Sequence, residues 1–154
     1  MRINNEGLWI VKHFEGYREE PYLCSAGVPT IGYGTCFYPD GTNVNLDDKP
    51  INEQLAIEFL VYGLQASEHA VARLVRSPLN ENQFSSLVSF IYNIGASRFK
   101  SSTLRSKLNR RDYVGASNEF WKWRRAAGRI LKGLVLRRKR EQILFDKKIQ
   151  VENG

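Results

Sequence analysis

A long helical stripe in the middle of the chain restricts the fold more than any other feature. The stripe begins at Asn52-Glu53-Gln54 and continues to Arg76. Its apolar and small side chains recur with the 3.6-residue period of an α-helix, at Ala56, Phe59, Leu60, Gly63, Ala70, Val71 and Leu74. At about 1.5 Å per residue such a helix spans ~37 Å, which is enough to connect two lobes. Gly63, near its centre, indicates either close packing or a point of bending.

The segment before this helix has the pattern of a small antiparallel sheet. The helical period disappears between Tyr17 and Asn45, and turn-forming Pro and Gly residues become frequent. Thr30–Tyr33 and Cys36–Tyr38 are the predicted strands, and Pro39-Asp40-Gly41-Thr42 is a predicted turn. A first helix precedes this region, with Asn4-Asn5-Glu6 as its cap and Gly16 at its end.

The segment after the long helix is helical throughout. Asn80-Glu81-Asn82-Gln83 begins a core helix in capping-box fashion, and that helix is expected to end at Tyr92-Asn93-Ile94-Gly95. Shorter helices are predicted around Leu104–Leu108 and after Asp112, and a last one from about Val135 to Asp146. The prediction is an α+β, mainly α fold in one domain, residues 1–154. It divides into a small β lobe at about 15–51, a connecting helix at 52–76, and a helical lobe at 77–150 that packs with helix 1–14.

Charge is distributed unevenly along the chain. Residues 1–97 hold 6 Lys/Arg against 11 Asp/Glu, a net −5, whereas residues 98–148 hold 17 against 4, a net +13. The basic carboxyl-terminal third is either a solvated surface or a binding surface for a polyanion, such as nucleic acid or an acidic cell envelope. The longest apolar run, Phe59–Tyr62, is far too short to cross a bilayer. We expect no export signal, because the first residues do not show a charged segment followed by an apolar stretch.

Three chemically useful side chains follow the first helix. Glu15 lies in its last turn, where the negative end of the helix dipole favours a protonated carboxyl. Cys24 and Thr30 follow at intervals of nine and six residues. In a chain without an export signal the two cysteines are expected to be reduced, although a Cys24–Cys36 disulfide is also compatible with the sequence.

These residues resemble the active-site signature of a known family. Glu15-Gly16, Tyr22 and Thr30-Ile31-Gly32-Tyr33-Gly34 are similar to the signature of the bacteriophage-type lysozymes, the endolysins of glycoside hydrolase family 24. The resemblance continues through the carboxyl-terminal half, at Asn82-Gln83-Phe84, Leu87–Phe90, Asn93-Ile94-Gly95, Ser102-Thr103-Leu104, Leu108-Asn109, Trp123, Gly133-Leu134-Val135, Arg137-Arg138 and Glu141. It therefore covers nearly the whole chain and implies a two-lobed lysozyme fold.

The resemblance also implies an activity and a set of site residues. The activity is that of a muramidase, which hydrolyses the β-1,4 bond between N-acetylmuramic acid and N-acetylglucosamine in peptidoglycan and lyses the host cell. Glu15 is the implied general acid, and Thr30 positions the attacking water. We expect Arg137 to form a supporting ion pair with Glu15, unless Arg137 is simply a surface cation. The expected substrate-binding residues are Tyr33, Gly34, Thr35, Tyr92 and Asn93, although Tyr92 also fits a helix core.

Cys24 departs from the family pattern, which usually has Asp at this position, and we still expect it to be the third catalytic residue beside Glu15 and Thr30. A thiolate there can act as a base, which gives inversion of configuration, or as a nucleophile, which gives retention. The third alternative is a half-buried thiol without a chemical role, in an enzyme that works through Glu15 and Thr30.

Partners and competing functions follow from the same residues. We expect no metal and no cofactor, because His13 and His69 form no ligand spacing with Cys or carboxylates. The expected protein is a monomer that accumulates in the host cytoplasm, needs a phage holin to reach the wall, and adsorbs to the anionic envelope through its basic third. The alternatives are a catalytically silent wall-binding relative and a nucleic-acid-binding protein that uses the cations of Arg124–Arg140.

Overall fold

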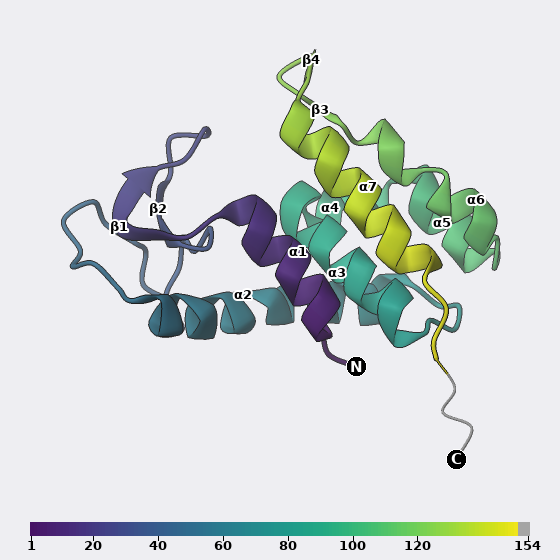
Figure 1. Ribbon diagram of the computed structural model, residues 1–154, viewed down its shortest axis with the longest axis horizontal. Coiled ribbons are helices and arrows are strands. Elements are labelled where there is room, and N and C mark those ends of the chain that lie inside the picture. Colours follow the sequence, from purple (N-terminus) through teal and green to yellow (C-terminus); the bar gives the residue numbers. More distant parts are fainter. Residues whose placement is uncertain (151–154) are drawn as a thin grey trace. The chain divides into compact units, whose positions relative to one another are not determined.

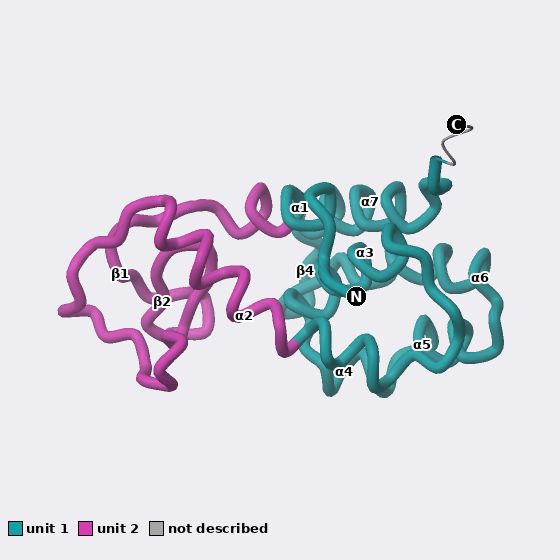
Figure 2. The backbone as a smooth tube through the Cα atoms, turned by 90° about the horizontal axis from the view of Figure 1, so that it is seen from below, with its two compact units in different colours: residues 1–10, 67–154 teal, residues 11–66 magenta. Residues whose placement is uncertain are grey.

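The computed structural model describes residues 1–150 of the chain (Figure 1). These residues form two compact units (Figure 2). Unit 1 contains residues 1–10 and the chain from residue 67 onward, and unit 2 contains residues 11–66. Two helices, α1 (Asn5–Glu15) and α2 (Glu53–Leu74), each have residues in both units. Helix α2 confirms the predicted connecting helix and ends two residues earlier than expected.

Unit 2 contains a two-stranded antiparallel sheet of β1 (Arg18–Leu23) and β2 (Pro29–Gly32). The prediction of a strand near Thr30 is confirmed, but the prediction of its partner at Cys36–Tyr38 is wrong, since Phe37 forms only an isolated bridge with Asn43. The true partner contains Glu19-Glu20-Pro21, whose composition is typical of a loop. The register shifts between Arg18 and Tyr22, so these three residues lie in an irregular stretch of the ladder, where charges and proline are tolerated.

Gly32 ends β2 in a conformation that an L-residue rarely adopts. Its φ is +64°, and a Cβ built on it would lie 3.1 Å from the Cβ of Ala56 in α2. We expect Gly32→Ala to lower the free energy of unfolding by about 2 kcal/mol, because backbone strain and crowding add. The matched control is Gly41→Ala, where φ is +87° and the space is open, so only the strain of about 1 kcal/mol remains. Urea unfolding measures both variants. If Gly32→Ala and Gly41→Ala lost the same free energy of unfolding, the close approach of Gly32 to α2 would be contradicted.

Unit 1 is built around α3 (Glu81–Ile94), which packs against α7 (Lys132–Asp146). The predicted capping box is confirmed: the Asn80 side chain accepts from the Gln83 amide, and the Gln83 side chain accepts from the Asn80 amide. Phe90 lies at the centre of the core, with its ring edge-to-face against those of Phe99, Phe120 and Trp123. The packing around Phe90 therefore fixes the last turn of α3, which carries Tyr92 and Asn93.

Short elements complete unit 1. They are α4 (Ala96–Lys100), α5 (Thr103–Asn109), α6 (Tyr113–Ser117), the 3₁₀ helix η1 (Phe120–Lys122) and a hairpin of β3 (Arg125–Ala126) and β4 (Arg129–Ile130). The predicted helix at 104–108 and the Asp112 cap are confirmed. The hairpin was not predicted, because its turn uses Ala127 at φ +51° beside Gly128 at φ +77°. Two positive φ angles are typical of a type I′ turn, but Ala is a rare residue there.

Among residues 1–150, no helix combines the length and apolar character that crossing a lipid bilayer requires.

Candidate active site

Glu15 is the last residue of α1. Gly16 follows with φ +73°, and its amide donates to the carbonyl of Lys12 over 3.0 Å. The left-handed glycine turns the chain away immediately after the carboxylate, as is common at helix carboxyl ends. The half-buried Glu15 side chain therefore lies at the negative end of the helix dipole, as the sequence predicts.

The turn between β1 and β2 brings Cys24 to Thr30. The Cys24 amide donates to the Val28 carbonyl over 3.0 Å, and the Gly27 amide donates to the Cys24 carbonyl over 2.8 Å. These two bonds close a tight loop. Just beyond the loop, Tyr22 of β1 pairs with Thr30 of β2. The sequence predicted both residues for the site, and the fold of unit 2 places them on one hairpin.

Backbone amides around this turn stabilise the Cys24 thiolate. Hydrogen bonds from the amides of Val28 and then Ala26 lower the pKa of Cys24, against a smaller opposing effect of desolvation. The Thr30 hydroxyl is a lesser contributor, because its single proton is donated to the Val28 carbonyl over 2.8 Å. A lowered pKa makes Cys24 more ionised near neutral pH than an ordinary thiol.

A second thiol lies beside the same hydroxyl. The Cys36 sulfur is 3.6 Å from Thr30 Oγ1, and both cysteines are free and half-buried. The disulfide that the sequence left open is therefore absent. Cys36 was not assigned to the site from the sequence, and the available signal was its position in the same segment as Cys24 and Thr30.

Tyr33, Gly34 and Thr35 form a tight loop after β2. Ile31 and Thr35 exchange two backbone hydrogen bonds of 2.9 Å each, and Gly34 between them has φ +81°. The Tyr33 side chain is buried, and its hydroxyl donates to Glu53 Oε1 over 2.8 Å. Burial, followed by the hydrogen bond to Glu53, raises the pKa of Tyr33 to about 12. The loop is thereby held firmly, and the substrate-binding role of its three residues stays a prediction.

The other predicted residues belong to unit 1. Tyr92 is half-buried and Asn93 exposed in the last turn of α3. Arg137 of α7 is buried; its Nε donates to Glu141 Oε2 over 3.3 Å and its Nη2 to the Ser89 carbonyl over 3.1 Å. The expected pairing of Arg137 with Glu15 joins residues of different units and stays a prediction.

Arg138 and Glu141 were not predicted as functional residues, yet they are almost fully buried, with exposed fractions of 1% and 0%. Burial lowers the pKa of Arg138, and the charge of Glu141 opposes this shift. From the sequence, Arg138 is expected to be one of the basic surface residues. The missed signal is a helical stripe in which charged residues occupy core positions between apolar ones, at Leu134, Arg137, Arg138, Glu141, Leu144 and Phe145.

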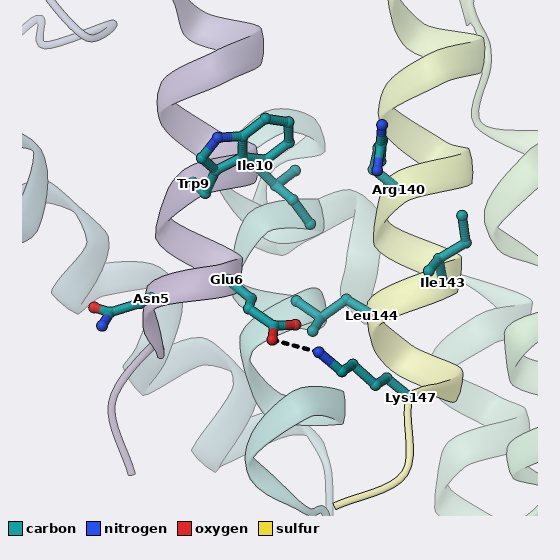
Figure 3. Close-up of a pocket in the computed structure, with 8 residues that line it drawn as sticks. All are labelled: Asn5, Glu6, Trp9, Ile10, Arg140, Ile143, Leu144 and Lys147. Atoms are coloured by element: carbon teal, nitrogen blue, oxygen red, sulfur yellow. Dashed lines mark hydrogen bonds and ion pairs between the residues drawn. The ribbon is translucent and has the colours of Figure 1, made fainter.

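A groove of about 630 Å³ lies between α1 and α7 within unit 1 (Figure 3). Trp9 and Ile143 line it with apolar surface, and the ion pair of Glu6 with Lys147 crosses one end. None of the predicted site residues lines this groove. Cys24 and Thr30 are therefore not part of its lining.

Comparison with known proteins identifies the family. The model of the family described as Phage lysozyme matches residues 12–141. The chain belongs to the phage lysozyme family. The match includes Glu15, Cys24 and Thr30, and it extends to Glu141.

Individual relatives of this phage lysozyme match over almost their full length. The endolysin of Salmonella phage P22 is 40% identical over 145 residues, which cover 94% of this chain and 98% of that protein. The endolysin of Acyrthosiphon pisum secondary endosymbiont phage 1 is 39% identical over 150 residues, which cover 95% and 99%. The solved endolysin from Escherichia coli O157:H7 phage FAHEc1 is 31% identical, covers 99% and 98% of the two chains, and superposes with a TM-score of 0.86. The predicted lysozyme-like α+β fold is confirmed, and the protein is a lysozyme-type glycoside hydrolase.

Proposed function

We propose that this phage lysozyme hydrolyses the β-1,4 bond between N-acetylmuramic acid and N-acetylglucosamine in peptidoglycan. The observation that carries the proposal is the hairpin cluster: the β1–β2 turn holds Cys24, whose pKa is lowered, on the same hairpin as the fixed hydroxyl of Thr30. Glu15, at the end of α1, supplies the acid in the same unit. These are the groups that glycoside hydrolysis requires, an acid for the leaving oxygen and a second group for water or the sugar carbon.

In the proposed reaction, Glu15 protonates the glycosidic oxygen as the bond to the sugar carbon breaks. The positive charge that develops on the sugar is stabilised by the Cys24 thiolate, which then acts in one of two ways. As a base it removes a proton from a water that attacks the opposite face, and Thr30 positions that water. As a nucleophile it forms a thioglycosyl intermediate, which water hydrolyses in a second step.

In this proposal the glycan is bound by Tyr33, Gly34, Thr35, Tyr92 and Asn93. Amide and hydroxyl groups suit this role, since they both donate to and accept from sugar hydroxyl and acetamido groups. Arg137 holds Glu15 in position through an ion pair.

The biological role is host cell lysis by a monomeric endolysin that needs neither metal nor cofactor. The enzyme accumulates in the host cytoplasm and reaches the wall after a phage holin permeabilises the membrane. The excess of cations in residues 98–148 promotes adsorption to the anionic envelope. Release of the enzyme from cells that lack a holin would contradict this route.

The experiment that tests the proposal is the clearing of purified peptidoglycan. The parent protein is added to sacculi in reducing buffer, and the loss of turbidity is recorded together with the release of reducing sugar. Both signals are expected, whereas binding to the sacculi without either would support a catalytically silent relative.

A substitution at Cys24 tests the role of the thiolate. We expect Cys24→Ser to lower the hydrolysis rate by about 10²-fold or more, because a serine hydroxyl is not ionised near neutral pH. The parent's rate is expected to rise with pH as Cys24 ionises, at a lower pH than the ordinary thiol value of about 8.5, because the pKa of Cys24 is lowered. This rise should be absent from the pH profile of Cys24→Ser.

The matched control is Cys36→Ser, which makes the same atomic change 3.6 Å from Thr30. It is expected to keep the parent's rate within about threefold and the parent's pH profile. An active Cys24→Ser enzyme with an unchanged profile would show that the thiol has no chemical role.

A further inference from the structure

Arg138 connects three separate segments of unit 1. Its Nε donates to the Trp123 carbonyl over 2.9 Å, its Nη1 to Glu141 Oε1, and its Nη2 to Asn93 Oδ1. The guanidinium also lies over the Phe90 ring, 4.9 Å from its centroid. Each of its three nitrogens therefore has a partner, and the planar group cannot rotate without breaking several of these contacts.

Glu141 fixes the guanidinium from the other side. This carboxylate, 0% exposed, accepts from the Ser89 hydroxyl over 2.6 Å and from Arg137 Nε over 3.3 Å, in addition to Arg138. The backbone carbonyl of Glu141 accepts from Ser86 over 2.5 Å. Helix α3 thus holds Glu141, Glu141 holds Arg138, and Arg138 reaches back to the end of α3.

The contact with Asn93 determines how its amide is oriented. A guanidinium has donors and no acceptor, so the atom of Asn93 that faces Arg138 must be the carbonyl oxygen. The opposite orientation would point two N–H groups at a buried cation. Since Asn93 is exposed, its NH₂ group remains available to a ligand from solvent. That group can only donate hydrogen bonds.

We infer that Arg138 is a positioning residue that makes Asn93 an obligate hydrogen-bond donor to the acetamido carbonyl of the glycan. This inference rests on the proposed function, in which Asn93 contacts the substrate. A sugar hydroxyl rotates to suit either end of an amide, so a fixed orientation gives no selectivity toward it. A carbonyl oxygen only accepts, and the fixed NH₂ group therefore selects N-acetylated sugars over sugars that carry a free ammonium.

The first test separates substrate binding from catalysis. Asn93→Asp keeps an acceptor for Arg138 and replaces only the outward NH₂ group. On soluble glycan strands we expect its KM to rise about tenfold, the loss of one substrate hydrogen bond, with kcat within about twofold of the parent. The variant should also prefer acetylated strands less strongly than the parent does. The ratio of kcat/KM for acetylated strands over strands with N-deacetylated glucosamine is expected to fall about tenfold. An unchanged ratio would overturn the inference.

The second test asks whether Arg138 acts through Asn93. Arg138→Met is made in the parent and in Asn93→Ala, and Arg140→Met is the control on the same helix, where the side chain is exposed. We expect Arg138→Met to raise KM about fivefold in the parent and by less than twofold when Asn93 is absent, since coupled residues are not additive. Arg140→Met should leave KM unchanged in both.

The outcomes distinguish this inference from the proposed function. Equal effects of Arg138→Met in both backgrounds would show a general structural role and overturn the inference. If Arg138→Met does not fold, Asn93→Asp decides alone, because that change lies on the surface. Failure of the parent to cleave any glycan would instead contradict the proposed function.

Discussion

Replacing Glu15 with glutamine is expected to lower the rate of peptidoglycan hydrolysis by about 10³-fold, within the range for loss of a general acid. Glutamine has nearly the same shape as glutamate, but its amide cannot deliver a proton to the leaving oxygen. Glu15 is the only carboxyl in the predicted cluster, and no neighbouring residue of that cluster is expected to replace it. The rate is measured as reducing sugar released from sacculi.

The matched control is Glu20→Gln, an exposed position in β1 that undergoes the same chemical change. It should keep the parent's rate, and both variants should unfold at the parent's temperature. If Glu15→Gln retained more than about a tenth of the parent's rate, the assignment of Glu15 as the general acid would be wrong.

Replacing Glu141 with alanine is expected to lower the free energy of unfolding by about 3–5 kcal/mol. Arg137 and Arg138 are 3% and 1% exposed, and without Glu141 each loses the carboxylate that it contacts in the core. Removing one partner from a buried ion pair is strongly destabilising because it leaves the other charge uncompensated. Urea or thermal unfolding followed by circular dichroism measures the loss.

The control for this variant is Glu6→Ala, which breaks the exposed ion pair with Lys147. The two side chains are 52% and 48% exposed, and exposed pairs contribute about 1 kcal/mol or less. A loss at Glu141 no larger than the loss at Glu6 would show that the buried charges find other partners.

The helices of this protein could be predicted from the sequence because local signals define them. The Asn80/Gln83 capping box, the Asp112 cap and the glycine after Glu15 each satisfy backbone groups within a few residues. The 3.6-residue period of the long helix is equally local. Boundaries were accordingly correct to within about three residues for α2, α3 and α7.

The features that the sequence did not predict depend on distant residues. Strand β1 contains Glu19-Glu20-Pro21 and is a strand only because β2 pairs with it. Arg138 resembles its exposed neighbours Lys139 and Arg140, and its burial is possible only because Glu141 and Asn93 satisfy it. For β1 such tertiary compensation has no signal in a local window of sequence, whereas for Arg138 the only local signal is the helical stripe in which it occupies a core position.

The candidate site could be predicted from the sequence only in part. The resemblance supplied Glu15, Cys24 and Thr30, but not the environment of the thiol. The lowered pKa of Cys24 arises from amides in a turn whose geometry was not predictable, and the neighbouring Cys36 was assigned no role.

The most direct test of the central claim is the identity of the sugar at the new reducing ends. Purified peptidoglycan is digested with the parent protein, reduced with borohydride and hydrolysed, and the resulting amino-sugar alcohols are identified by mass spectrometry. Cleavage of the proposed bond predicts muramitol, derived from N-acetylmuramic acid, and its absence after digestion by Glu15→Gln. Glucosaminitol in place of muramitol, or no new reducing ends, would contradict the proposed function.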